Sequence, residues 1–199
     1  MASAKRKPSA ERRLEIIETA QEILVSEGFH KLTLRNVAKK VGIKLASLQY
    51  HYSNRAVLVK AVFEQATAHY DSKITKFLSM DLTVQPKLMI AEGVKILLDD
   101  HKSEEENQFF YQIMAMAVEE KAAQEVIDDY YQKIWTMSEN LLLQFNPSLD
   151  QEERINRSAQ IISMVDGCVF FIGSKRLHRK LPDSFYEQIQ NWVVKLVFE

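Results

Sequence analysis

The sequence contains few of the residues that cross-link or interrupt a fold. Its one cysteine, Cys168, allows no intrachain disulfide and no cysteine-rich zinc site, and it suits a reducing cytoplasm. Only 5 glycines and 4 prolines occur in 199 residues, which favours long helices over many short strands. No stretch approaches the roughly 18 uninterrupted apolar residues of a membrane span, and no apolar segment follows the basic residues 5–7 as in a signal peptide. We therefore expect a cytoplasmic protein without a membrane partner.

The sequence also lacks a large net charge, but its charges are unevenly distributed. Lys and Arg number 26 against 27 Asp and Glu, for a formal net charge of -1. Residues 1–60 hold 12 basic and 5 acidic side chains, a net of +7, whereas residues 61–199 hold 14 and 22, a net of -8. Such asymmetry indicates a basic module that binds an anion, joined to an acidic body. With 46% apolar residues the chain is expected to fold.

Helical periodicity and helix-start signals recur along the whole chain. A first amphipathic helix is expected between Ser9, a residue suited to an N-cap, and Gly28, a C-cap. Asn54 is placed to cap a helix that runs to about residue 78, and Pro86 suits a first helical position. Capping-box spacing marks three more starts, at Ser103, Ser148 and Ser184. The later helices are expected at 86–101, 104–120, 122–145, 150–174 and 184–198.

These signals predict an all-α protein of about nine helices. Its N-terminal part is expected to be a three-helix domain in residues 1–55, with a helix-turn-helix motif at about residues 33–52. A larger helical domain is expected in residues 56–199.

The helix-turn-helix is predicted from two short helices joined by a glycine. Residues 33–41 supply the first helix, with a buried stripe at i, i+3, i+4 and i+7. Gly42 then permits a left-handed turn that other residues resist. Residues 43–52 supply the second helix, which such motifs place in the DNA major groove. The residues expected to face the core are Leu34, Val37, Ala38 and Val41 on the first helix and Ile43, Leu48 and Tyr52 on the second.

The opposite face of the second helix has side chains suited to DNA. Gln49 can pair bidentately with an adenine edge, Ala46 can touch a thymine methyl group, and Lys44 can meet a phosphate or a guanine. Hydroxyl and imidazole groups nearby suit phosphate oxygens, as do helix N-termini. The candidate DNA contacts are Thr33, Arg35, Lys44, Leu45, Ala46, Ser47, Gln49, Tyr50, His51 and Arg55.

The stretch from Thr33 to Leu58 resembles the DNA-binding domain of TetR-family transcriptional regulators. The resemblance rests on Leu-Thr-Leu-Arg-Asn-Val-Ala at 32–38, Val-Gly-Ile at 41–43 and Leu-Gln-Tyr-His-Tyr at 48–52. It implies phosphate contacts at the positions of Ser47, Tyr50, His51 and Arg55, and base contacts at those of Leu45, Ala46 and Gln49. The chain departs from the family pattern at residues 44–47 and at Gln49.

The same resemblance implies a small-molecule pocket in the helical body. Aromatic and methionine side chains adapt to varied apolar ligands, although residues at this spacing are more often plain core. Asp166, in an otherwise apolar run, either pairs across a dimer interface or faces water. The candidate pocket residues are Met89, Phe109, Phe110, Met114, Tyr130, Trp135 and Phe170.

The last two helices are rich in apolar residues and are expected to form an isologous four-helix interface in a homodimer. The candidate interface residues are Ile161, Val165, Val169, Ile189, Trp192, Val193 and Leu196.

Catalysis has little support, because the 5 histidines form no metal-binding or nucleophilic motif and no glycine-rich phosphate loop occurs. We expect no enzyme, no catalytic residue, no metal and no cofactor. The expected function is a homodimeric repressor that an apolar small molecule releases from a near-palindromic DNA operator. The alternatives are an activator, a repressor controlled by a protein partner, or a helical lipid-binding protein or enzyme with a chance helix-turn-helix.

Overall fold

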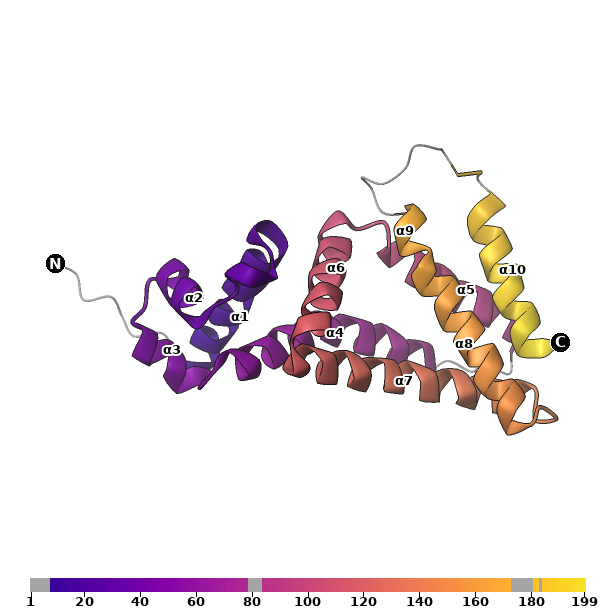
Figure 1. Cartoon of the computed structure of the whole chain (residues 1–199). Coiled ribbons are helices and arrows are strands. Elements are labelled where there is room, and N and C mark those ends of the chain that lie inside the picture. Colours follow the sequence, from indigo (N-terminus) through magenta and orange to yellow (C-terminus); the bar gives the residue numbers. More distant parts are fainter. Residues whose placement is uncertain (1–7, 79–83, 173–180, 183) are drawn as a thin grey trace. The chain divides into compact units, whose positions relative to one another are not determined.

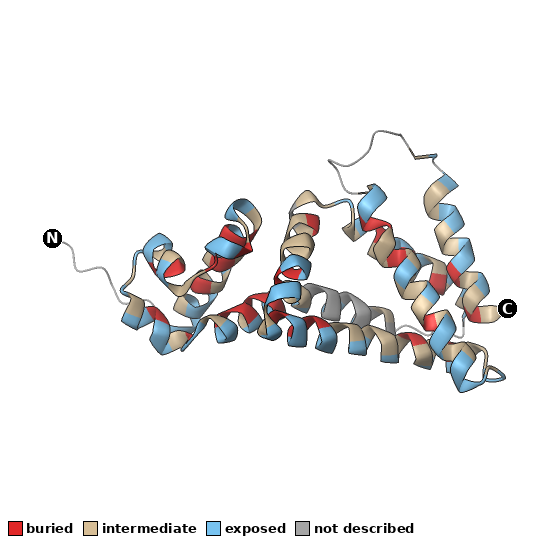
Figure 2. Ribbon diagram, viewed as in Figure 1, coloured by how far each residue is buried: buried red, intermediate tan, exposed pale blue. Residues whose placement is uncertain are grey.

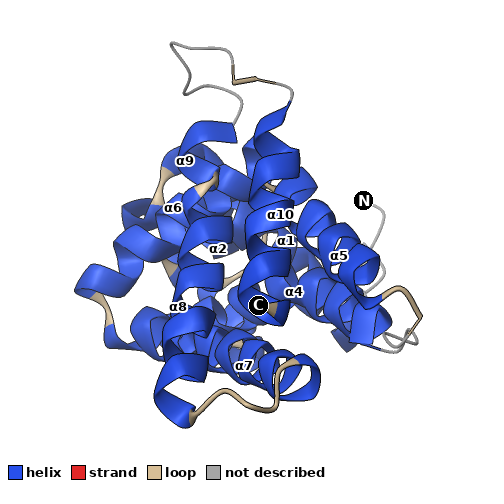
Figure 3. Cartoon of the chain, turned by 90° about the vertical axis from the view of Figure 1, so that its right-hand side faces the viewer, coloured by secondary structure: helices blue, strands red, loops and turns tan. Residues whose placement is uncertain are grey.

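The computed structural model describes residues 8–78, 84–172, 181–182 and 184–199, in which all regular structure is helical (Figures 1 and 3). The all-α fold is therefore confirmed. None of the helices in these ranges is long and apolar enough to cross a membrane. In chain order the elements are α1 (Ser9–Glu27), the 3-10 helix η1 (Phe29–Lys31), α2 (Leu34–Val41), α3 (Leu45–His51), α4 (Arg55–Leu78), α5 (Pro86–Asp100), α6 (Glu104–Glu119), α7 (Lys121–Phe145), α8 (Gln151–Gly167), α9 (Val169–Ile172) and α10 (Ser184–Phe198).

Several predicted helix starts are confirmed by their capping contacts. The Thr33 hydroxyl accepts a hydrogen bond from the Asn36 amide at 3.1 Å, and the Asn54 side chain accepts one from the Val57 amide at 3.0 Å. Pro86 is the first residue of α5. These side chains satisfy amides that a helix leaves without an internal partner.

Several expected caps and boundaries are wrong. Ser9 is the first residue of α1 and not its cap, because Pro8 holds the cap position without a side-chain hydrogen bond. The cap of α8 is Asp150, whose carboxylate accepts from the Glu153 amide at 2.8 Å, whereas the Ser148 hydroxyl donates to Asn146. The helix predicted from 150 to 174 is also divided, because α8 ends at Gly167 and a separate turn, α9, follows Cys168. The expected residues 173 and 174 lie outside the described residues.

Gly42 makes the turn between α2 and α3 possible. Its φ of 78° and ψ of 32° are left-handed, a conformation that a side chain resists. The amide of the next residue, Ile43, donates to the Ala38 carbonyl at 2.9 Å, which closes the end of α2. The predicted turn is confirmed.

The chain divides into two compact units. The first comprises residues 1–72 and 108–127, and the second comprises residues 73–107 and 128–199. Long helices therefore contribute to both units, since α4, α6 and α7 each cross a unit boundary. The division at residues 55 and 56 expected from the sequence coincides with the start of α4, and as a domain boundary it stays a prediction.

The core of the first unit lies among α1, η1, α2, α3 and the start of α4, with buried residues along their inner faces (Figure 2). Val37 and Ala38 of the predicted stripe are buried, and Leu34 and Val41 are half-buried. On α3 the predicted core residues Leu48 and Tyr52 are fully buried, whereas Ile43 is half-buried. The other fully buried members include Ile16, Ala20, Leu24, Leu32, Leu58 and Val62.

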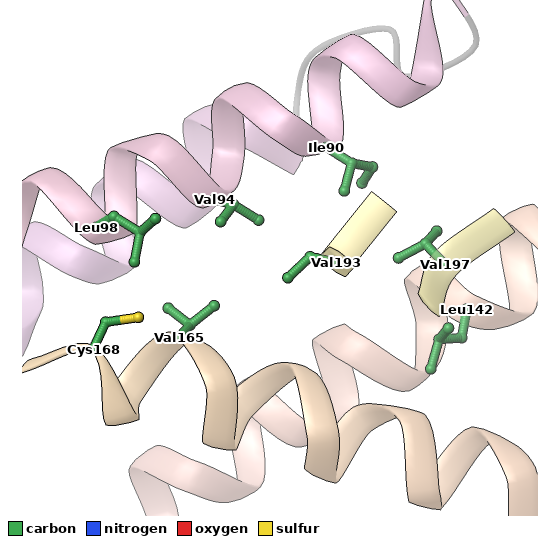
Figure 4. Close-up of a cluster of buried hydrophobic side chains, with 8 residues drawn as sticks. All are labelled: Ile90, Val94, Leu98, Leu142, Val165, Cys168, Val193 and Val197. Carbon is green, nitrogen blue, oxygen red and sulfur yellow. The ribbon is translucent and has the colours of Figure 1, made fainter. Parts of the chain in front are cut away.

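The core of the second unit joins α5, α7, α8 and α10 (Figure 4). Polar contacts align these helices as well: the Gln190 side chain donates to the Ala91 carbonyl at 2.8 Å, and Arg157 donates to the Leu196 carbonyl at 2.8 Å. The buried apolar cluster consists of Ile90, Val94, Leu98, Leu142, Val165, Cys168, Val193 and Val197.

We expect Gly42→Ala to lower the free energy of unfolding by about 1–2 kcal/mol, because alanine must adopt a left-handed conformation there. The measurement is equilibrium unfolding in urea. Gly167→Ala is the matched control: an added Cβ meets nothing within 4 Å, and α8 is right-handed at that position, so stability should be unchanged or rise by up to about 1 kcal/mol. Equal stability of the two variants would contradict the role given to Gly42.

Candidate nucleic-acid interface

The orientation of α3 is set by one buried face and one basic side chain. Leu48 and Tyr52 are both 0% exposed, so this face of α3 is held in the core. The Tyr52 hydroxyl donates to the Arg13 carbonyl at 3.3 Å, and the Arg13 guanidinium lies 4.7 Å from the Tyr52 ring centre. Arg13 also donates to the His51 carbonyl at 3.2 Å. Arg13 of α1 therefore fixes the C-terminal end of α3, a role that the sequence did not reveal.

The opposite face of α3 is open to solvent, as expected. Tyr50 is 81% exposed, and Gln49, Ser47 and Ala46 are exposed beside it. Lys44 immediately before α3 is exposed as well. Leu45 and His51, at the two ends of α3, are half-buried. The arrangement presents amide, hydroxyl, aromatic and ammonium groups on one short helix.

Exposed basic side chains also lie on α2 and just before it. Lys31, Arg35 and Lys39 are exposed there, whereas Thr33 is half-buried and uses its hydroxyl as the α2 cap. Lys40 differs, because its ammonium lies 3.3 Å from carboxylates of both Glu22 and Glu27. Its charge is thus largely compensated within the chain.

Arg55 does not lie with these exposed residues. Its guanidinium donates to the Phe29 carbonyl at 3.0 Å and to the Leu32 carbonyl, and it pairs with the Glu120 carboxylate. Burial lowers the pKa of Arg55. The phosphate contact that the resemblance implied for Arg55 is therefore replaced by internal contacts in this structure.

Comparison with known proteins identifies this helix-turn-helix. Residues 16–62, from α1 to α4, match the family described as "Bacterial regulatory proteins, tetR family". The N-terminal region therefore contains a helix-turn-helix of the TetR family. That family is described as regulatory proteins, which are not enzymes. A curated relative, the fatty acid metabolism regulator protein of Bacillus subtilis (strain 168), is 20% identical over 90 residues, which cover 44% of this chain and 46% of that relative's length.

Solved structures resemble the fold over nearly the whole chain. A transcriptional regulator from Rhodococcus sp. Rha1 has a TM-score of 0.69 and 16% identity, covering 93% of this chain and 95% of that one. The multidrug binding protein EbrR, complexed with malachite green, has a TM-score of 0.69 and 18% identity, covering 94% and 98%. At these identities the likeness shows the fold.

The candidate pocket residues do not fall in one compact unit. Phe109, Phe110 and Met114 belong to the first unit, where the Phe109 ring lies 6.5 Å from that of Phe63. The remaining four, Met89, Tyr130, Trp135 and Phe170, belong to the second unit. Met114 is 37% exposed and Phe170 is 53% exposed, while the other candidates are half-buried. The pocket lining stays a prediction.

In the structure Asp166 belongs to a polar cluster of the second unit. The Tyr131 hydroxyl of α7 donates to the Asp166 carboxylate of α8 at 2.7 Å. Burial raises the pKa of Asp166, against the opposing effects of Tyr131 and His101. Burial likewise lowers the pKa of His101, at the end of α5, although Asp166 opposes that shift. The cluster joins α5, α7 and α8 at a site where burial favours the neutral forms of Asp166 and His101.

The candidate interface residues separate into two groups. Val165, Val169 and Val193 are no more than 5% exposed within the chain itself, so they are already occupied by core contacts. Ile161, Ile189 and Leu196 are half-buried, and Trp192 is 56% exposed. Buried and exposed apolar residues thus occur on the same helix, as Val193 and Trp192 do on α10. The apolar periodicity of the sequence did not distinguish the residues of the chain's own core from those available to a partner.

We expect Asp166→Asn to raise the melting temperature at pH 8. A carboxyl whose pKa is raised by folding stabilises the fold while protonated, and this contribution is lost as the pH rises through its folded-state pKa. The gain should disappear as the pH falls to about 4, where the native carboxyl is itself protonated. Thermal unfolding at several pH values measures the effect, and the exposed Asp129→Asn controls for the lost charge. A gain of the same size at every pH would contradict this explanation.

Proposed function

We propose that the chain is a sequence-specific DNA-binding regulator whose α3 enters the major groove. The observation that carries this proposal is the fixed orientation of α3: Leu48 and Tyr52 are buried, and Gln49 and Tyr50 are exposed. A recognition helix needs a rigid mounting and a free polar face, because base edges are read by hydrogen bonds of defined geometry.

The residues of this surface divide into two roles in the proposal. Gln49, with Leu45 and Ala46, reads base edges. Phosphate contacts set the register and carry no sequence information themselves. These come from Thr33, Arg35, Lys44, Ser47, Tyr50 and His51. Arg55 is left out of this set because its guanidinium is bound within the chain.

We further propose that the regulator is a cytoplasmic homodimer that pairs through α8, α9 and α10. Large apolar side chains remain exposed on these helices, and a dimer interface would remove them from water. A two-fold interface would place two copies of α3 about 34–36 Å apart, or at a multiple of this spacing, and so require a near-palindromic operator. The exposed side chains are Ile155 at 39%, Phe170 at 53%, Phe171 at 54% and Trp192 at 56%.

Repression released by a small molecule completes the proposal. A ligand that binds the helical body in one conformation shifts the population toward dimers whose α3 spacing no longer fits DNA. The resemblance to EbrR, which was solved with malachite green, supports a small-molecule effector for this chain. The lining of the pocket stays a prediction, and the effector is expected to be mainly apolar. An activator with the same DNA surface is the alternative.

We expect Tyr50→Ala and Gln49→Ala to alter DNA binding in different ways. Tyr50→Ala should weaken binding to every duplex and reduce the salt dependence, since a phosphate contact is lost. Gln49→Ala should cost about 1–3 kcal/mol on preferred duplexes and little on others, because a base contact is lost. Fluorescence anisotropy with 40 bp duplexes at several salt concentrations measures both, and exposed Gln132→Ala on α7 is the control. Absence of salt-dependent binding by the native chain would refute the proposed function.

We expect the native chain to be a dimer at micromolar concentration and Trp192→Asp to be a monomer. The aspartate would place an unpaired charge in the apolar interface, at a cost of several kcal/mol. Sedimentation velocity measures the mass. Leu143→Asp on α7, where the native side chain is 49% exposed, is the matched control and should remain dimeric. A native monomer, or equal dimerisation of the two variants, would exclude the interface.

A further inference from the structure

Side chains on one face of α6 contact η1 and Arg55, next to the segment that leads into α2 of the helix-turn-helix. Gln112, Met116 and Glu120 are spaced four residues apart, and the Glu120 amide still bonds to the Met116 carbonyl at 2.8 Å as in a continuing helix. All three contact η1 or Arg55, and all of these groups belong to the first compact unit. The spacing places these three side chains on one face of α6 and of the residue that follows it, toward the turn before α2.

Gln112 binds the start of η1. Its side-chain oxygen accepts a hydrogen bond from the Phe29 amide at 3.0 Å. The first amides of a helix have no partner inside the helix, so this contact satisfies a group that would otherwise need water. Gly28 just before it adopts a φ of 89° and brings the backbone close to Gln112.

Arg55 binds the end of the same turn. Its guanidinium donates to the Phe29 carbonyl and, through Nε, to the Leu32 carbonyl, and it also contacts the Met116 sulfur at 3.5 Å. Leu32 is fully buried and directly precedes Thr33, the cap of α2. The planar guanidinium can serve two carbonyls and one carboxylate together, as a single ammonium cannot. The carboxylate is that of Glu120.

We propose that Gln112, Arg55 and Glu120 form a clamp, and that Glu120 is a positioning residue for DNA binding although it does not touch DNA. Glu120 neutralises and directs the Arg55 guanidinium, which then fixes the turn that leads into α2 and α3. The ion pair contributes little to global stability, because both side chains are more than a quarter exposed. Its effect is local and acts on the orientation of the DNA surface, so this inference rests on the proposed function.

Hydrogen exchange of the full-length native chain without DNA is the first test. In Glu120→Ala, Arg55 loses its partner, and the amides of Phe29 and Leu32 should exchange about tenfold faster as the turn opens more often. Glu119→Ala removes the same charge from the neighbouring exposed position and should leave these amides protected as in the native chain. Equal exchange in the two variants would overturn the clamp.

DNA affinity is the second test, with the tightest-binding duplex recovered from a random pool. Glu120→Ala should bind about tenfold more weakly than Glu119→Ala, with the same salt slope as the native chain because no phosphate contact is lost. Unchanged or tighter binding would overturn the positioning role, since tighter binding means that Glu120 withholds Arg55 from DNA. If the native chain binds no duplex, the proposed function fails, whereas the exchange experiment still decides whether the clamp exists.

Discussion

The DNA-facing surface depends on the burial of Leu48 and Tyr52. A helix of seven residues is not stable alone in water, so the contacts of α3 with the rest of the chain determine both its existence and its direction. Arg13 adds a hydrogen bond to the carbonyl of His51 and a ring contact to Tyr52. With one side so fixed, the exposure of Gln49 follows from the helical period alone.

The structure shows which of the positive charges in residues 1–60 are exposed and which are paired within the chain. The net +7 of residues 1–60 overstates what DNA can meet, because Arg55 is paired with Glu120, which lies outside that range. Exposed positive charge is concentrated on the flanks of α2 and α3, where Arg35, Lys39 and Lys44 lie. The acidic remainder of the chain would be repelled by phosphates, which favours contact through this surface.

Local chemistry was predictable from the sequence, and long-range contacts were not. Thr33 and Gly42 act within four residues of themselves, so their roles could be inferred in advance. Arg55 lies 65 residues from Glu120, and no local pattern announces that pair. Val193 illustrates the same limit. The apolar pattern of its helix predicts that Val193 is buried, but it does not tell whether its own chain or a partner chain buries it. Ser148 and Asp150 are both suited to an N-cap, and the sequence did not show which of them is used. In the structure Asp150 caps α8.

Selection of bound duplexes from a random pool tests directly whether α3 of two paired chains reads a symmetric DNA site. We expect recovery of a near-palindromic sequence whose half-sites are about 10–10.5 bp apart, or a multiple of that distance. Recovery of no enriched sequence, or of single half-sites without a symmetric mate, would contradict it.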